Sequence, residues 1–123
     1  MPQMWKGARK KMRILIAINE NNGINSKLSE HFGHCPYFAI YETETNSLEI
    51  VENKIDHSNQ NLTPVDQVMK FNPDTVFTLG AGQRAINLFK ERQVKLKTGD
   101  YKIVQEVIED IDKLKDLGGG CDH

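Results

Sequence analysis

The sequence predicts an α/β fold: a mixed five-stranded sheet with helices on both of its faces. Residues 12–18 form a continuous, isoleucine-rich apolar run, which is typical of a strand buried on both sides. Two strand-like segments follow as a hairpin, and after them helical and strand patterns alternate along the chain. Because strand–helix–strand connections are right-handed, this alternation places helices on both faces of the sheet.

Five segments have the pattern of strands: residues 12–18, 37–41, 48–52, 74–79 and 94–97. The polar turn between the second and third segments predicts that these two pair as an antiparallel hairpin. We expect the first, fourth and fifth strands to run parallel, with the second antiparallel to them. The polar segments 19–27 and 56–61 are expected to be loops.

Three helices are expected between and after the later strands. The first begins at Thr63, a typical N-cap residue, with Pro64 in the first helical position. The second follows a glycine-containing turn at residues 80–82, and the third spans residues 101–117. This order of elements predicts a ribonuclease-H-like three-layer sandwich with strand order 3-2-1-4-5.

Length and composition limit the class of protein. A chain of 123 residues with 38% hydrophobic and 27% charged residues fits one globular domain. No apolar run approaches the roughly 18 residues that span a bilayer, and two cysteines far apart in sequence do not make a disulfide framework. We therefore expect a cytoplasmic protein with a disordered basic leader over residues 1–11, one domain over 12–117 and a flexible tail over 118–123.

Charge and missing motifs exclude several functions. Residues 1–13 hold five of the 16 Lys and Arg residues and no acid, so the rest of the chain carries 11 basic against 17 acidic residues. A domain with this acidic excess is not expected to bind nucleic acid. The first strand lacks the carboxylates that two-metal nucleases require, and the chain has no P-loop, GxGxxG or Ser-His-Asp order. We expect no enzymatic activity.

The strongest candidate for a site is the segment 29–36, Ser-Glu-His-Phe-Gly-His-Cys-Pro. Within it, His31, His34 and Cys35 supply imidazole and thiol groups, ligands that favour zinc, copper, iron and iron–sulfur centres. Gly33 prevents the segment from continuing as a helix, so these side chains lie on a loop after the first strand. Functional residues concentrate on such loops.

Other loops are expected at the same end of the sheet. His57 follows the third strand, and Gly80 and Gly82 follow the fourth; ligands of open α/β sheets bind at the carboxyl ends of such strands. The first amides of the helix after Gly82 are suited to an anion or a cluster sulfide. Cys121 and His123 are weaker metal candidates, because the tail is expected at the opposite end of the sheet.

Three segments together form a family pattern: residues 12–18 (MRILIAI), the loop 26–33 (SKLSEHFG) and residues 36–38 (PYF). Residues 51–53 (VEN) and 79–85 (LGAGQRA) add to it. In this pattern the chain resembles the dinitrogenase iron–molybdenum cofactor biosynthesis family, which includes NifX-type carriers and the domain appended to the NifB cofactor synthase. The resemblance covers residues 12 to about 110.

The resemblance implies a carrier domain that holds or escorts an iron–sulfur or iron–molybdenum cofactor, or a precursor of one. It also implies metal-cluster assembly proteins as its partners. The histidine of the His-Phe-Gly loop, His31, is the ligand that it identifies. Among the loop residues, we expect His31 and Cys35 to be the main metal ligands and His34 and His57 to be weaker ones. The full set of expected cofactor-binding residues is His31, Phe32, Gly33, His34, Cys35, Gly80 and Gly82.

Two other hypotheses stay open at this point. The loop around His57 has one histidine and no glycine, and the glycine pair that the family carries after the fifth strand is reduced to Gly99. These reductions favour a protein-interaction or regulatory module that binds no cluster. The other hypothesis is a mononuclear zinc or copper site formed by His31, His34 and Cys35.

Overall fold

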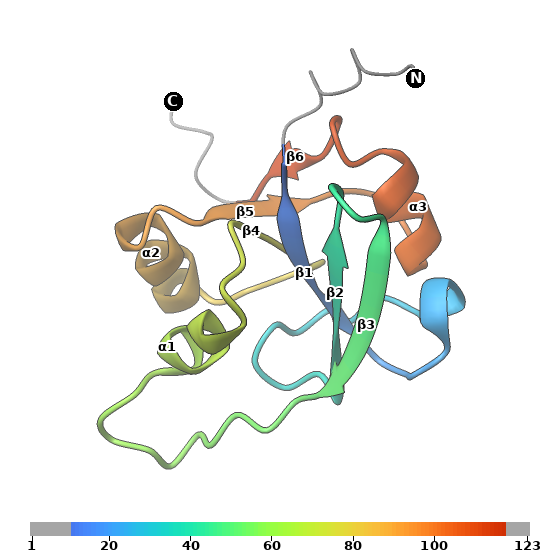
Figure 1. Ribbon diagram of the computed structural model, residues 1–123. Coiled ribbons are helices and arrows are strands. Elements are labelled where there is room, and N and C mark those ends of the chain that lie inside the picture. Colours follow the sequence, from blue (N-terminus) through green and yellow to red (C-terminus); the bar gives the residue numbers. More distant parts are fainter. Residues whose placement is uncertain (1–10, 118–123) are drawn as a thin grey trace.

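The structure is a computed structural model that describes residues 11–117, and it contains a six-stranded sheet between layers of helices (Figure 1). The strands are β1 (Arg13–Ile18), β2 (Tyr37–Glu42), β3 (Ser47–Glu52), β4 (Thr75–Phe77), β5 (Lys95–Thr98) and β6 (Lys115–Asp116). The helices are α1 (Pro64–Val68), α2 (Gln83–Glu91) and α3 (Val104–Glu109), with 3-10 turns η2 (Gly23–Asn25) and η3 (Met69–Phe71). Apart from Lys11, the predicted leader lies outside the described residues, as does the predicted tail.

The strand order is β3-β2-β1-β4-β5-β6, which confirms the predicted order of the first five strands and the three-layer sandwich. β1 pairs antiparallel with β2 and parallel with β4, and β4 pairs parallel with β5, as predicted. At the centre of the sheet, Ile16 lies opposite Ala39 on one side and Phe77 on the other. β1 is thus enclosed by a strand on each side.

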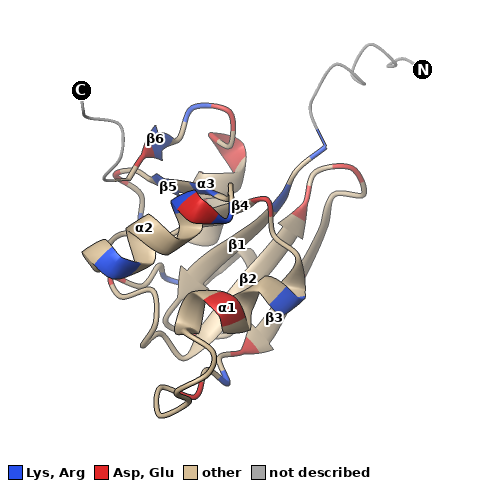
Figure 2. Cartoon of the chain, turned by 90° about the vertical axis from the view of Figure 1, so that its left-hand side faces the viewer, with Lys and Arg blue, Asp and Glu red and all other residues tan. Residues whose placement is uncertain are grey.

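Two apolar clusters fill the space on either side of the sheet. Leu15 and Ala17 of β1 belong to the cluster under α1 and α2, whereas Ile14, Ile16 and Ile18 belong to the cluster under α3. Figure 2 shows α1 and α2 lying over the near face of the sheet. Because both faces of β1 are covered, every residue from 14 to 18 is fully buried, which explains its unbroken apolar sequence.

The start of α1 is fixed by the predicted cap. The side chain of Thr63 accepts a hydrogen bond from the Asp66 amide at 3.1 Å, and the Asp66 carboxylate accepts one from the Thr63 amide at 3.1 Å. Such a reciprocal box stabilises the first turn of a helix. After η3 the chain leaves the helix at Asn72, whose φ of 58° is left-handed, just before Pro73.

The prediction of a helix over residues 101–117 is wrong in its length. α3 ends at Glu109, and the chain then turns, with the amide of Lys113 donating to the carbonyl of Asp110 at 2.7 Å. The following β6 pairs antiparallel with β5, and the Leu117 amide donates to the Leu96 carbonyl at 2.9 Å. Backbone groups on the outer edge of β5 thereby gain hydrogen-bond partners. The helical periodicity of the sequence does not reveal this long-range pairing.

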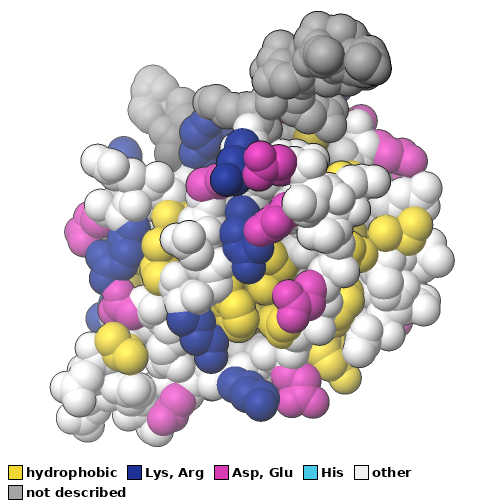
Figure 3. Space-filling model, viewed as in Figure 1, with side chains coloured by type: hydrophobic (Ala, Val, Ile, Leu, Met, Phe, Trp, Pro, Cys, Tyr) yellow, Lys and Arg dark blue, Asp and Glu magenta, His cyan; other side chains and the backbone are white. Residues whose placement is uncertain are grey.

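The surface shows no strong charge asymmetry on the face seen in Figure 3. Basic and acidic side chains lie next to one another there, with hydrophobic side chains exposed between them. No helix within residues 11–117 is both long and apolar enough to cross a membrane.

Candidate functional site

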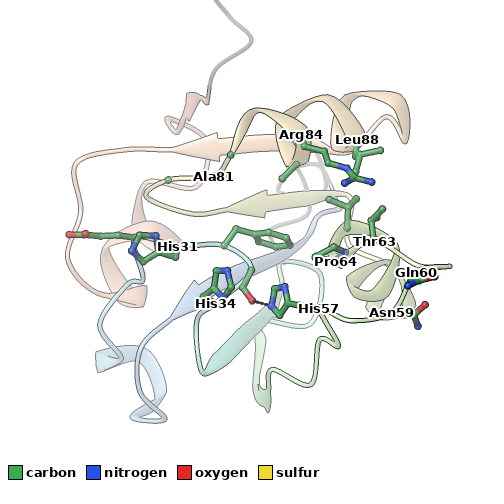
Figure 4. Close-up of a pocket in the computed structure, with 17 residues that line it drawn as sticks. His31, His34, His57, Asn59, Gln60, Thr63, Pro64, Ala81, Arg84 and Leu88 are labelled. Carbon is green, nitrogen blue, oxygen red and sulfur yellow. Dashed lines mark hydrogen bonds between the residues drawn. The ribbon is translucent and has the colours of Figure 1, made fainter.

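A cavity of about 810 Å³ lies at the end of the sheet where β1 and β4 finish. Its walls are the loop after β1, the loop between β3 and α1, and the turn between β4 and α2 (Figure 4). The strand directions predicted that these three loops lie at one end of the sheet, together with the segment 97–99, which does not line the cavity. The cavity therefore sits at the carboxyl ends of parallel strands beside a change in strand order, where α/β sheets commonly bind ligands.

Backbone hydrogen bonds join the loop after β1 to the turn after β4. The amide of Leu79 donates to the Ser29 carbonyl at 3.3 Å, and the amide of Phe32 donates to the Gly80 carbonyl at 3.2 Å. The two loops approach so closely that a Cβ atom on Gly80 would lie 2.8 Å from the Glu30 carbonyl oxygen. Glycine is therefore needed at position 80 for this close packing of the two loops, and the residue also lines the cavity.

The side chain of Phe32 anchors the loop after β1 in the core. It is 3% exposed and packs edge-on against Phe89 of α2 at a centroid distance of 5.2 Å. Its ring also meets Phe38 of β2 at 5.8 Å. Because Phe32 points inward, the exposed residues around it, His31 and His34, are left at the cavity wall.

Two histidines from different loops stack on each other at the cavity wall. The rings of His34 and His57 are nearly parallel, with an interplanar angle of 8° and centroids 4.4 Å apart (Figure 4). The Nε2 atom of His57 lies 2.9 Å from the carbonyl oxygen of Gly33. A carbonyl only accepts, so this contact is a hydrogen bond when Nε2 carries the proton, and in that neutral ring Nδ1 keeps a lone pair. His31 lines the same cavity but stands apart from this pair.

The structure places Cys35 outside the cavity lining. Its side chain is buried, and its thiol donates a hydrogen bond to the carbonyl of Phe32 with the sulfur 3.2 Å from the oxygen. Burial raises the pKa of the Cys35 thiol to about 11, so the group stays protonated, whereas metals bind the thiolate. This geometry argues against the predicted role of Cys35 as a direct ligand.

The described residues also bear on the hypothesis of a single metal ion. Within residues 11–117, no group of three His, Cys, Asp or Glu side chains is placed to hold one ion. The proposed zinc or copper site from His31, His34 and Cys35 is thus not assembled in this arrangement. The two weaker candidates, Cys121 and His123, lie outside the residues that the structure describes.

The start of α2 contributes positive charge to the cavity. Gly82, its N-cap residue, provides no side-chain acceptor, and the first turn contains no acidic residue. The first amides of the helix thus keep their positive partial charge. Arg84 of the same turn lines the cavity and has no ion-pair partner among the described residues, whereas Glu30 is the lining carboxylate. Arg84 was not predicted from the sequence, although its place in the first turn after Gly82 was a usable signal.

The buried thiol gives a test of this description. In a chain carrying Cys121→Ser, we expect Cys35 to react with a thiol-specific alkylating reagent at pH 8 about 100-fold more slowly than in the unfolded chain, because only the thiolate reacts. The raised pKa also means that protonated Cys35 stabilises the fold fully below the pKa of an unfolded thiol, and that this contribution falls as pH rises toward 11. Equal alkylation rates for the folded and unfolded chains would contradict the burial.

Solved structures of several proteins are similar to this chain over most of its length. A Thermotoga protein provisionally named NifB is 25% identical and matches with a TM-score of 0.74, over 91% of this chain and 98% of that one. The apo form of the orange protein from Desulfovibrio gigas is 15% identical, with a TM-score of 0.73 over 89% and 96% of the two chains. A Methanocaldococcus jannaschii protein provisionally named a dinitrogenase is 17% identical, with a TM-score of 0.69 over 89% and 98%.

The last two similarities establish the fold alone. A comparison with curated proteins gives no match. Residues 12–114, which include every described wall of the cavity, match the model of the family described as dinitrogenase iron-molybdenum cofactor. The chain therefore belongs to the dinitrogenase iron-molybdenum cofactor family.

Proposed function

We propose that this chain is a non-enzymatic carrier that holds an iron–sulfur or iron–molybdenum type cofactor, or a precursor of one, in the cavity beside β1. The observation that carries the proposal is the convergence of three imidazoles, from His31, His34 and His57, on one cavity. Imidazole is a common ligand of iron and other transition metals. Membership of the family supports the choice of cargo.

The spacing of the ligands favours a cluster over a single ion. No three candidate ligands within residues 11–117 are close enough to share one metal, yet three imidazoles line a common space. A polynuclear cargo offers several metal atoms and is therefore able to bond imidazoles that lie apart. The volume of about 810 Å³ also falls in the range of about 300–1,000 Å³ that is usual for small-molecule sites.

The electrostatics suit a cargo with negative charge. The amino end of α2 and the guanidinium of Arg84 face the cavity with one carboxylate, Glu30, as the opposing charge. Amides at a helix start stabilise sulfide or carboxylate groups, because their N–H dipoles point at the ligand. In this arrangement Gly80 and Gly82 shape the wall next to the cargo, while Phe32 and Gly33 hold the loop that presents the histidines.

In this role the protein would receive its cargo from, and pass it to, metal-cluster assembly proteins in the reducing cytoplasm. Histidine ligands suit such transfer, since neutral imidazoles bind metal without the charge of a thiolate. The protonated thiol of Cys35 takes no part in binding and belongs to the core beneath the loop.

An anaerobic titration of the full chain with a reconstituted iron–sulfur cluster, followed by visible absorption, tests the proposal. We expect saturable binding by the native chain, and about 10- to 100-fold weaker binding by each of His31→Ala, His34→Ala and His57→Ala, because each removes one bond to metal. Asn21→Ala is the matched control, since Asn21 is exposed and does not line the cavity.

Two results would reject the carrier role: no spectrum with the native chain, or equal affinities for the native chain and all three histidine variants. After the first result, the alternative of a protein-interaction module without a cluster would account for the fold.

A further inference from the structure

The residue that follows β3, Asn53, bonds the loop that carries His34. Its side-chain amide nitrogen lies 2.6 Å from the carbonyl oxygen of Cys35 and 3.2 Å from that of Gly33. Its backbone amide donates to the Pro36 carbonyl at 2.9 Å, which extends the pairing of β2 and β3 by one step. A single side chain thus bonds the carbonyls of Gly33 and Cys35, the residues on either side of His34.

The orientation of the Asn53 amide follows from its third contact. The backbone amide of Ile55 lies 2.8 Å from Oδ1 of Asn53 and is able only to donate. Oδ1 must therefore face Ile55, and Nδ2, which is the donor, faces the two carbonyls. Nδ2 also lies 3.8 Å from the sulfur of Cys35, so the amide group of Asn53 bonds Gly33, Cys35 and Ile55.

The Gly33 carbonyl joins Asn53 to His57. It accepts one hydrogen bond from Nδ2 of Asn53 and a second from Nε2 of His57 at 2.9 Å. A Cβ atom on Gly33 would lie 3.2 Å from the His57 ring, so the two residues are also in close packing. The Gly33 carbonyl is thus shared between the amide of Asn53 and the ring nitrogen Nε2 of His57.

We propose that Asn53 is a positioning residue: through the Gly33 carbonyl it holds His57 in the Nε2–H tautomer, so that Nδ1 is the nitrogen that bonds the cargo. Nδ1 of His57 has no hydrogen bond among the described residues, and the stacked ring of His34 limits rotation of the His57 plane. Histidines that bind metals generally donate their other ring N–H to a carbonyl or carboxylate, which is the arrangement found here. The role of Nδ1 as the nitrogen that bonds the cargo rests on the proposed carrier function, whereas the tautomer of His57 does not.

The tautomer is measurable in the full chain without any cargo. We would record long-range ¹H–¹⁵N spectra of the imidazoles at about pH 8, above the usual imidazole pKa of about 6.5. We expect His57 of the native chain to be a single Nε2–H tautomer, and exposed His31, whose ring makes no hydrogen bond among the described residues, to give a mixture. A mixture at His57 of the native chain would overturn the inference.

Variants test the part played by Asn53. Asn53→Asp keeps the acceptor for Ile55 but removes the bonds that Nδ2 donates to Gly33 and Cys35, and Asn53→Ala removes these bonds and the acceptor without adding charge. In both we expect His57 to become a mixture like His31, with the remaining amide spectrum preserved. Asn59→Asp is the control: it adds the same charge at the cavity, and the oxygen that accepts from Asn61 and Leu62 is retained.

A single His57 tautomer in folded Asn53 variants would also overturn the inference. If neither variant folds, the His57 tautomer of the native chain is the remaining test: a single Nε2–H tautomer supports the inference, and a mixture overturns it.

A cluster titration measures the consequence for binding. We expect Asn53→Asp to weaken cluster binding about 10-fold in the native background and to have no further effect in a His57→Ala background, because Asn53 acts through that ring. Equal losses in the two backgrounds would show that Asn53 acts on the loop in general, and would reject positioning of His57. If the native chain binds no cluster, the carrier proposal fails while the tautomer measurement still decides this one.

Discussion

Replacing Phe32 by alanine is expected to destabilise the protein by about 3–5 kcal/mol, the usual cost of deleting a buried phenylalanine ring. Phe32 is 3% exposed and packs between Phe38 and Phe89, so its loss leaves a cavity under the loop after β1. Urea unfolding would measure the free-energy change. The same variant should lose the ring-current shifts that the stacked His34 and His57 give each other, because their loop is no longer anchored.

The matched control for this variant is Phe77→Ala. Phe77 is fully buried in the cluster under α3, on the other side of the sheet from the Phe32 cluster. We expect a comparable loss of stability but unchanged shifts at the stacked histidines. If Phe32→Ala left those shifts at their native values, the role of its ring as the anchor of the loop would be wrong.

Replacing Gly80 by alanine should cost about 1–3 kcal/mol and separate the two loops that line the cavity. The new methyl group would meet the backbone oxygen of Glu30 at 2.8 Å, and a backbone atom has no rotamer by which to move away. The hydrogen bond from the Phe32 amide to the Gly80 carbonyl should weaken as well. Urea unfolding gives the stability, and amide hydrogen exchange at Phe32 reports the bond.

The neighbouring glycine provides a matched comparison. A Cβ atom on Gly82 meets nothing within 4 Å, and its φ of −71° is accessible to alanine. Gly82→Ala should therefore cost only about 0.5–1 kcal/mol, because alanine is a poorer N-cap than glycine, and should leave exchange at Phe32 unchanged. Equal effects of the two substitutions would mean that loss of glycine flexibility, rather than the contact with Glu30, causes the damage.

Most of the fold was predictable because its signals are local. The apolar run of β1, the hairpin of β2 and β3 and the Thr63 cap each follow from residues close together in sequence. The exception is the last segment. The positions of Ile111 and Leu114 continue the helical spacing of α3, but the chain turns after Glu109 and adds β6 to the sheet. The partner of β6 is the exposed edge of β5, which no local pattern identifies.

The location of the site was predictable from the sequence, whereas the residues that form it were less so. Strand directions alone brought the loops of His31, His57 and Gly80 to one end of the sheet. Sequence spacing grouped Cys35 with the histidines, but residue 35 lies next to β2, and its side chain turns into the core. The bonds of Asn53 to that loop span 18 and 20 residues, so only the three-dimensional structure reveals them.

The outer position of β3 has a consequence for how the protein behaves at high concentration. Among the described strands β3 ends the sheet on one side, and its free backbone groups form a template on which a second chain is able to pair. The exposed carboxylates of Glu49 and Glu52 stand along this strand. Edge-to-edge pairing of two copies would bring these like charges together at neutral pH, which opposes aggregation through the open edge.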